Sequence, residues 1–165
     1  MKREMQIEVR AVEGDKPMLR GYAAVFNRLS DDLGGFRERI MPGAFKRALA
    51  SNPDVLCLVN HDMRALLGRT MNGTCRVKED DKGLCFECDL PNTSAGNDVR
   101  ELIKRGDMSQ CSFGFCVDED DWDEEDDPEN PEEKMICRTI RSVKSLKDVS
   151  PVVQPAYPQT VVKTS

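Results

Sequence analysis

The sequence predicts a mainly β protein with α-helices, folded as a closed or nearly closed β-barrel of about seven to nine strands with flanking helices. Three observations favour this class. Short segments of alternating apolar and polar residues recur along the 165-residue chain, turn-forming residues separate them, and only two segments show helical spacing. Closely spaced short strands are typical of barrels. A two-layer α+β sheet is the alternative architecture.

The expected strands follow one another from the N-terminus. The first two pair as a hairpin around the turn at 13–15, and an acidic turn at 79–83 joins a later pair. The last strands return antiparallel to the strand at 108–117. The segments with strand character are 5–12, 18–27, 36–40, 55–59, 66–70, 73–78, 84–90, 108–117, 135–143 and 146–153.

Two short helices are expected between these strands. Residues 44–51 place Phe45, Ala48 and Leu49 at helical spacing. A second helix is expected over residues 97–105, with Thr93 or Ser94 as its N-cap and Gly106 at its end. Both helices are amphipathic and should cover the outside of the sheet structure.

Charge is distributed unevenly over what we expect to be a single domain, residues 1–165. The net charge is −6, yet residues 118–133 carry twelve acidic and no basic residues, so the remainder is about +6. Such a run predicts a disordered, solvated acidic loop. The proline-rich tail from residue 155 should be extended. The moderate basic charge of the remainder does not indicate nucleic-acid binding.

Other classes of function find little support in the sequence. No apolar run approaches the length of about 18 residues that spans a bilayer, and residues 1–10 lack an apolar signal segment, so a soluble cytosolic protein is expected. Seven cysteines in a reducing cytosol are expected to be free thiols. Cys85 and Cys88 form half of a zinc motif, but no second pair completes it. We therefore expect no metal and no cofactor.

The segment 108–117 carries the candidate chemistry. Cys111, Phe113 and Phe115 should face a core, leaving Ser112 on the opposite face with Gly114 beside it. A serine becomes a nucleophile when an imidazole accepts its proton, and His61 is the one histidine of the chain. Cys111 is a rival nucleophile, but a buried thiol is inert.

The imidazole also needs a carboxylate that fixes its tautomer. Asp62, Asp107 and Asp148 lie near expected strand ends. Asp62 follows His61 directly, so its side chain should point away from the ring, which makes Asp148 the better candidate. From pattern alone, a structural histidine and an ordinary polar strand face remain the commoner explanation, and no G-x-S-x-G elbow indicates an α/β-hydrolase.

Several motifs in register resemble one known family. The chain is similar to the tailed-phage prohead serine proteases of the Hong Kong 97 type from residue 21 to residue 160. The motifs that carry the resemblance are GYAAVFN (21–27), GGFRERIMPGAF (34–45), NHD (60–62), LGR (67–69), GLCFECDLP (83–91), SFGF (112–115) and DVSPVVQPAYPQT (148–160).

The resemblance implies a serine endopeptidase that matures the phage capsid. It would act inside the prohead, in the bacterial host cytoplasm, on the scaffold protein or on the scaffolding segment of the major capsid protein. The family is distantly related to herpesvirus assemblin, which implies a similar barrel and makes a homodimer or higher self-association plausible. Its nucleophile falls on Ser112, its histidine on His61 and its third member on Asp148, where many relatives carry Glu.

A non-catalytic capsid assembly or scaffolding module on the same barrel is the alternative function. The position of His61 separates the two hypotheses. A protease needs the imidazole within hydrogen-bond reach of the Ser112 hydroxyl, whereas an assembly module does not.

Overall fold

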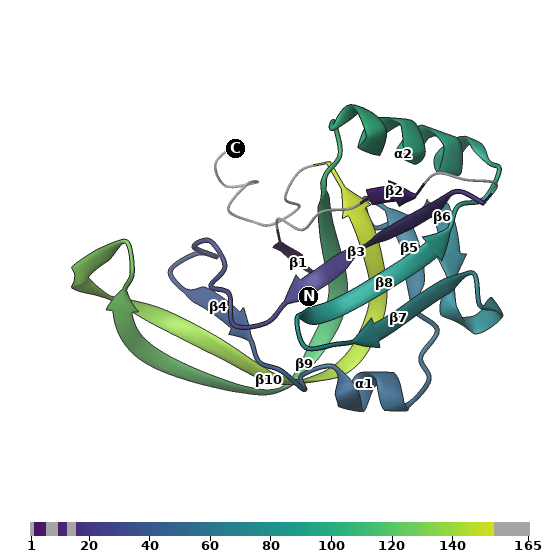
Figure 1. The fold of residues 1–165 in the computed structure, drawn as a ribbon. Coiled ribbons are helices and arrows are strands. Elements are labelled where there is room, and N and C mark those ends of the chain that lie inside the picture. Colours follow the sequence, from purple (N-terminus) through teal and green to yellow (C-terminus); the bar gives the residue numbers. More distant parts are fainter. Residues whose placement is uncertain (1, 6–9, 13–15, 154–165) are drawn as a thin grey trace.

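The chain folds into two β-sheets that share one hydrophobic core (Figure 1). The structure is a computed structural model that describes residues 2–5, 10–12 and 16–153, with side chains from residue 16 onward. The larger sheet has the order β1-β9-β10-β5-β6, and β4 pairs with β10 off this path. Its strands are β1 (Lys2–Met5), β4 (Arg37–Ile40), β5 (Leu56–Val59), β6 (Asp62–Arg69), β9 (Gln110–Asp127) and β10 (Asn130–Val152).

The smaller sheet packs over the larger one with the order β2-β3-β8-β7, and all its pairs are antiparallel. Its strands are β2 (Arg10–Val12), β3 (Met18–Val25), β7 (Cys75–Glu79) and β8 (Gly83–Asp89). In the larger sheet β10 runs parallel to β4 and β5 and antiparallel to β9. The chain passes from β6 to β7 through the 3₁₀ turn η1 (Thr70–Asn72).

The prediction of a mainly β protein is confirmed, with 56% of the chain in strands and 14% in helices. The prediction of a closed barrel is not confirmed. The chain enters the smaller sheet from the larger one at η1, and no ladder joins β6 to β7 among the described strands, so two separate sheets result.

The core lies between the sheets and contains the aromatic face of β9. Phe113 packs edge-on against Phe45 with ring centroids 5.6 Å apart, and Phe115 stacks on Phe113 at 4.6 Å. Cys111 is buried in the same cluster. The predicted alternation of this strand is therefore confirmed. Because successive side chains of a strand point to opposite faces, this packing also fixes the direction of Ser112.

Two α-helices flank the sheets, as predicted. α1 (Lys46–Ala50) lies against β10, and α2 (Ser94–Arg105) lies against β2 and β6 (Figure 1). Thr93 caps α2, because its hydroxyl accepts a hydrogen bond from the Gly96 N–H at 3.2 Å. Gly106 ends it with φ = 85°, a left-handed conformation that glycine adopts readily. Neither described helix has the length and apolar character needed to cross a membrane.

Some strand boundaries differ from the prediction. The two segments expected at 135–143 and 146–153 form the single strand β10. Register shifts between Ile140 and Asp148 keep β10 paired with β9 through the residues that separate the two segments. In the predicted strand 5–12, the described parts belong to different sheets, and residues 6–9 lie outside the description. The tail from residue 155 also lies outside the described residues.

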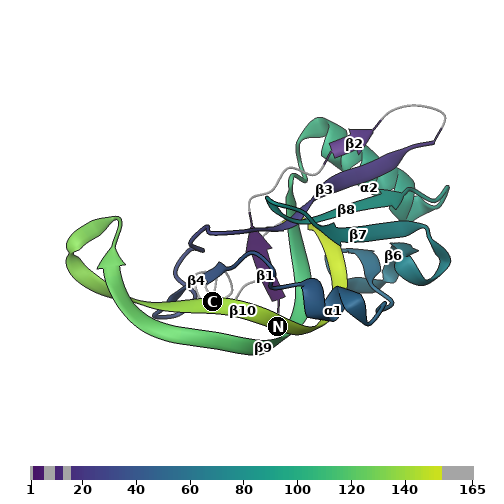
Figure 2. The same ribbon diagram turned by 60° about the horizontal axis from the view of Figure 1, so that its bottom comes forward.

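The acidic segment 118–133 is a β-hairpin, which corrects the prediction of a disordered loop. It forms the outer half of the β9–β10 hairpin and projects away from the two sheets (Figure 2). We call it the acidic arm. Residues 120–127 of the arm pair in antiparallel register with residues 130–140 of β10, from Asp120 opposite Ile140 to Asp127 opposite Asn130.

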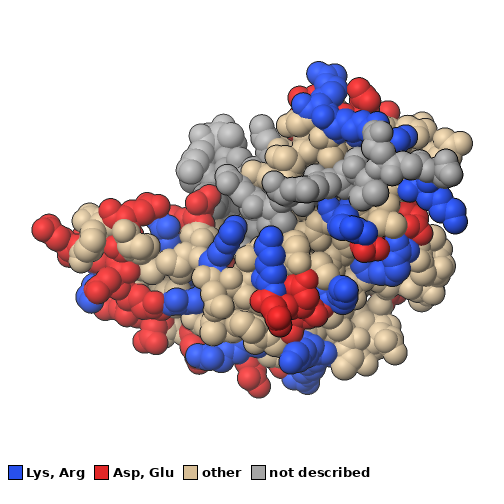
Figure 3. Space-filling view, viewed as in Figure 1, with Lys and Arg blue, Asp and Glu red and all other residues tan. Residues whose placement is uncertain are grey.

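Basic residues from other parts of the chain explain why the acidic arm is ordered. The Arg138 Nε donates to Asp120 at 2.7 Å, and an Arg37 nitrogen lies 3.0 Å from a Glu129 oxygen. Arg39 pairs with Glu125 and Arg47 with Asp118. Red acidic and blue basic side chains accordingly lie side by side on the arm (Figure 3). In the fold, basic residues of the rest of the chain thus neutralise part of the negative charge of the acidic arm.

We predict that salt loosens the acidic arm selectively. The ion pairs of the arm are partly exposed, and raising ionic strength from about 0.1 M to 1 M shortens the Debye length from about 10 Å to about 3 Å. Hydrogen–deuterium exchange of residues 118–135 should therefore accelerate in 1 M NaCl, whereas residues 110–117 of the same strand should not change. Equal acceleration in both halves of β9, or none in the arm, would contradict the role of these pairs.

Candidate active site

Ser112 lies in the interior of β9, where the backbone is fixed on both sides. It pairs with Glu4 of β1 and with Ser150 of β10, and its side chain is fully buried. A nucleophile on such a strand has little conformational freedom to lose when a substrate binds. The polar face predicted for Ser112 is thus enclosed rather than solvated.

His61 lies in the two-residue turn between β5 and β6. Val59 pairs with Asp62, so Asn60 and His61 alone form the loop, and their φ angles are 53° and 58°. Positive φ at both positions is the requirement of a type I′ turn. Asn and His tolerate this region better than most residues, but it remains a strained backbone that surrounding contacts must maintain.

Asn60 supplies these contacts. Its N–H donates to the Pro151 carbonyl at 3.0 Å, and its side-chain Oδ1 accepts from the Val153 N–H at 3.0 Å. The turn is therefore tied to the end of β10 by both backbone and side chain. The sequence showed only that β5 delivers Asn60 and His61 together. The role of Asn60 depends on the long-range placement of β10, which no local pattern in the sequence indicates.

The imidazole of His61 connects two predicted site residues. Its Nε2 lies 2.8 Å from the Ser112 Oγ, and its Nδ1 lies 2.5 Å from the Asp148 Oδ2. The His61 side chain is only 3% exposed. The structure thus brings together the three residues that the sequence singled out, from β9, the β5–β6 turn and β10. An imidazole held in this way can accept the hydroxyl proton while the carboxylate stabilises the resulting positive charge.

Two neighbours fix the position of the Asp148 carboxylate, and no local pattern in the sequence connects either of them with it. The Ser150 hydroxyl donates to Asp148 Oδ2 at 2.7 Å. Gly114 lies opposite Asp148 in the ladder, and a Cβ at this position would lie 2.3 Å from Asp148 Oδ1. Only a glycine therefore leaves room for the carboxylate. Both contacts depend on the register of β9 and β10, which a single sequence does not state.

The other carboxylates considered as partners of His61 are occupied elsewhere. Asp62 accepts from the Arg64 backbone N–H and guanidinium, which lower the pKa of its carboxyl group, so its side chain is directed away from the ring as predicted. Asp107 forms an exposed pair with Arg105 at 3.2 Å. Asp148 is the member of the set that contacts His61.

The rival nucleophile and the predicted zinc motif have different places in the fold. Burial in the core raises the pKa of the Cys111 thiol, which opposes formation of the reactive thiolate. Cys85 and Cys88 are three residues apart in β8 and so lie on opposite faces of the strand. They cannot act as a pair of zinc ligands while this strand is intact.

A comparison with known families agrees with this geometry. A family model described as caudovirus prohead serine protease matches residues 5–165. The chain belongs to this family. Among curated proteins, the prohead protease of Enterobacteria phage HK97 is 34% identical over 113 residues, which cover 67% of this chain and 47% of that relative. The chain thus spans about half the length of the relative. No solved structure matches the chain.

We predict that Gly114→Ala disrupts this prohead protease family site. The added methyl group collides with the Asp148 carboxylate and should displace it from His61, at a cost of about 1–3 kcal/mol in stability. The far-downfield NMR signal of the proton between His61 and Asp148 should disappear. Cys116→Ala, two residues along the same face of β9, is the control and should retain it. A signal unchanged in Gly114→Ala would show that the carboxylate does not depend on this glycine.

Proposed function

We propose that this chain is a serine endopeptidase of phage capsid maturation, with Ser112 as nucleophile, His61 as general base and Asp148 as the orienting carboxylate. It would cut scaffold protein, or the scaffolding segment of the major capsid protein, inside the prohead in the bacterial cytoplasm. One observation carries the proposal: the His61 ring lies 2.8 Å from the Ser112 hydroxyl and 2.5 Å from the Asp148 carboxylate, in a chain of the prohead serine protease family.

In the first half of the reaction, Ser112 Oγ attacks the scissile peptide carbonyl while its proton passes to His61 Nε2. The Asp148 carboxylate holds the Nδ1 proton and stabilises the imidazolium. Backbone N–H groups near Ser112 would bind the oxyanion, and each such donor contributes about 3 kcal/mol. When the intermediate collapses, the C–N bond breaks, and the imidazolium returns its proton to the leaving amine.

In the second half, water replaces the amine. His61 takes a proton from the water, the hydroxide attacks the ester on Ser112, and the acyl group leaves as a carboxylic acid while the Ser112 oxygen regains its proton. The burial of Ser112 and His61 excludes bulk water, which strengthens the electrostatic interactions of the site. A peptide therefore reaches the hydroxyl only when the site opens.

Three arginines that could serve as side-chain ligands of the oxyanion already have acidic partners. Arg69 pairs with Asp54, Arg138 with Glu38 and Asp120, and Arg141 with Asp121. These pairs favour structural roles for the three guanidinium groups. We therefore assign the oxyanion site to backbone N–H groups.

A non-catalytic assembly module would not need the observed hydrogen bonds. A buried His–Asp pair beside a buried serine places three polar side chains in the protein interior, where such groups are costly unless they are hydrogen-bonded. The hydrogen-bonded connection from Ser112 to Asp148 therefore supports the protease over the module. Self-association, expected from the resemblance to assemblin, remains a prediction.

Ser112→Ala should abolish proteolysis while the fold persists. The substitution removes the attacking oxygen, and we expect the cleavage rate of co-expressed scaffold and capsid proteins to fall by roughly 10⁴-fold or more. Mass spectrometry of the product termini measures cleavage. Ser142→Ala, whose hydroxyl contacts Asp118 in the acidic arm, is the matched control. Cleavage by Ser112→Ala at the rate of the control would exclude Ser112 as nucleophile.

Asp148→Asn should reduce kcat by roughly 10⁴-fold, because an amide can no longer hold the His61 Nδ1 proton in the productive tautomer. The matched control is Asp62→Asn, next to His61 but paired with Arg64, which should leave kcat within about threefold because exposed ion pairs contribute little. Labelling of Ser112 by a fluorophosphonate gives a second readout. If the two variants lost activity equally, the orienting role of Asp148 would be wrong.

A further inference from the structure

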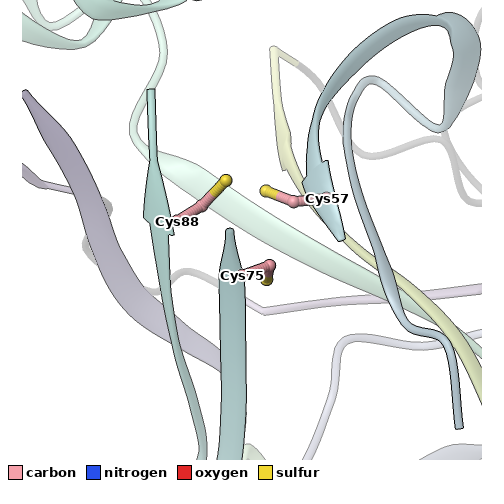
Figure 4. Close-up of side chains that lie close together, drawn as sticks. All are labelled: Cys57, Cys75 and Cys88. Carbon is pink, nitrogen blue, oxygen red and sulfur yellow. The ribbon is translucent and has the colours of Figure 1, made fainter. Parts of the chain in front are cut away.

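Three cysteine thiols converge between the two sheets, and none of them belongs to the proposed catalytic residues. Cys57 comes from β5 of the larger sheet, and Cys75 and Cys88 come from β7 and β8 of the smaller one. Their Sγ atoms all lie within 4.8 Å of one another, and each residue is at most 1% exposed. Figure 4 shows the sulfurs of Cys57 and Cys88 facing each other, with Cys75 beside them.

The strand register produces this cluster. Cys75 and Cys88 are directly paired in the β7–β8 ladder, so their side chains leave the same face of the smaller sheet. Cys57 faces them from the larger sheet. Cys57 and Cys75 are 18 positions apart in the chain, and Cys75 and Cys88 are 13 apart. No short cysteine motif therefore predicts the cluster.

The thiols influence one another in a way that isolated buried cysteines do not. Hydrogen bonds from the Cys57 and Cys88 thiols lower the pKa of Cys75 to about 4, and the nearby Arg76 charge acts in the same direction. The Cys75 and Cys88 thiols, together with burial, raise the pKa of Cys57. In contrast, burial alone raises the pKa of Cys111. The three sulfurs are therefore close enough to act on one another and to reach a single metal ion.

We propose that Cys57, Cys75 and Cys88 form a three-sulfur binding site for a soft monovalent metal ion, Cu(I). Thiolates select Cu(I), zinc or iron–sulfur clusters. Structural zinc is almost always bound by four ligands. Within the described part of the chain, the cluster offers three donors, and His61 is held by Ser112 and Asp148. Three sulfurs without a fourth ligand therefore match Cu(I) better than zinc.

Metal binding at this site would connect the two sheets. Copper–sulfur bonds would replace the S–H bonds of the thiols that ionise, and their protons would pass to solvent, so affinity should rise with pH. The ion would also fix β5 against the smaller sheet, and β5 leads directly into the turn that carries His61. The first measurable consequence is a more stable fold.

The test uses the full chain, refolded without oxygen in the presence of a reductant, because the thiols are buried. One equivalent of Cu(I) is supplied from a bicinchoninate complex, which competes for the ion. We expect one tightly held Cu(I) per chain, three sulfur neighbours by X-ray absorption, and a rise of about 5–10 °C in the unfolding midpoint. Zn²⁺ at the same concentration should not displace Cu(I).

Cys57→Ser and Cys88→Ser should lose this tightly held ion and the rise in the unfolding midpoint. Cys137→Ser, a buried cysteine outside the cluster, should retain both. Failure of the unsubstituted chain to take Cu(I) from bicinchoninate would overturn the proposal, and this measurement does not depend on whether a variant folds. Displacement of Cu(I) by Zn²⁺, or equal loss in Cys137→Ser, would also overturn it.

Discussion

The antiparallel ladder between β9 and β10 is the interaction on which the rest of the structure depends. It places Ser150 opposite Ser112 and Asp148 opposite Gly114. On its other edge, β10 pairs in parallel with β5, so that Asp148 lies beside Leu56, and the turn after β5 brings His61 over the site. A shift of one residue in the register between β9 and β10 would turn Asp148 to the other face of the sheet. The contact between Asp148 and His61 would then be lost.

The proposed catalytic residues lie in a part of the fold that local preferences alone would not stabilise. Buried polar groups are tolerated only when they are hydrogen-bonded. Here Ser112, His61, Asp148 and Ser150 form a connected chain of hydrogen bonds. The left-handed backbone at His61 adds strain, which Asn60 offsets by binding the end of β10. The neighbouring hydrophobic packing of Phe113 and Phe115 supplies the rigid support that the polar cluster needs.

Local patterns in the sequence predicted most strands, both helices and the face on which Ser112 lies. Alternation identified the buried Phe113 side of β9, and the adjacency of Asp62 to His61 correctly favoured Asp148 as the partner of the imidazole. Long-range pairing could not be predicted in this way. The acidic arm looked disordered because its own residues repel one another, whereas its partners, such as Arg39 and Arg47, are about 70 to 90 positions away. The thiol cluster could not be predicted for the same reason, because its three cysteines come together only through long-range strand pairing.

The length of β10 connects the acidic arm with the proposed catalytic residues. One unbroken strand runs from Asn130, near the tip of the acidic arm, to Asp148, a length of about 60 Å at a strand's usual rise. The register shifts between Ile140 and Asp148 interrupt the regular ladder between these two regions. Bulges of this kind permit local bending and extra twist. The last of these shifts lies between Leu146 and Asp148, directly beside the carboxylate that contacts His61.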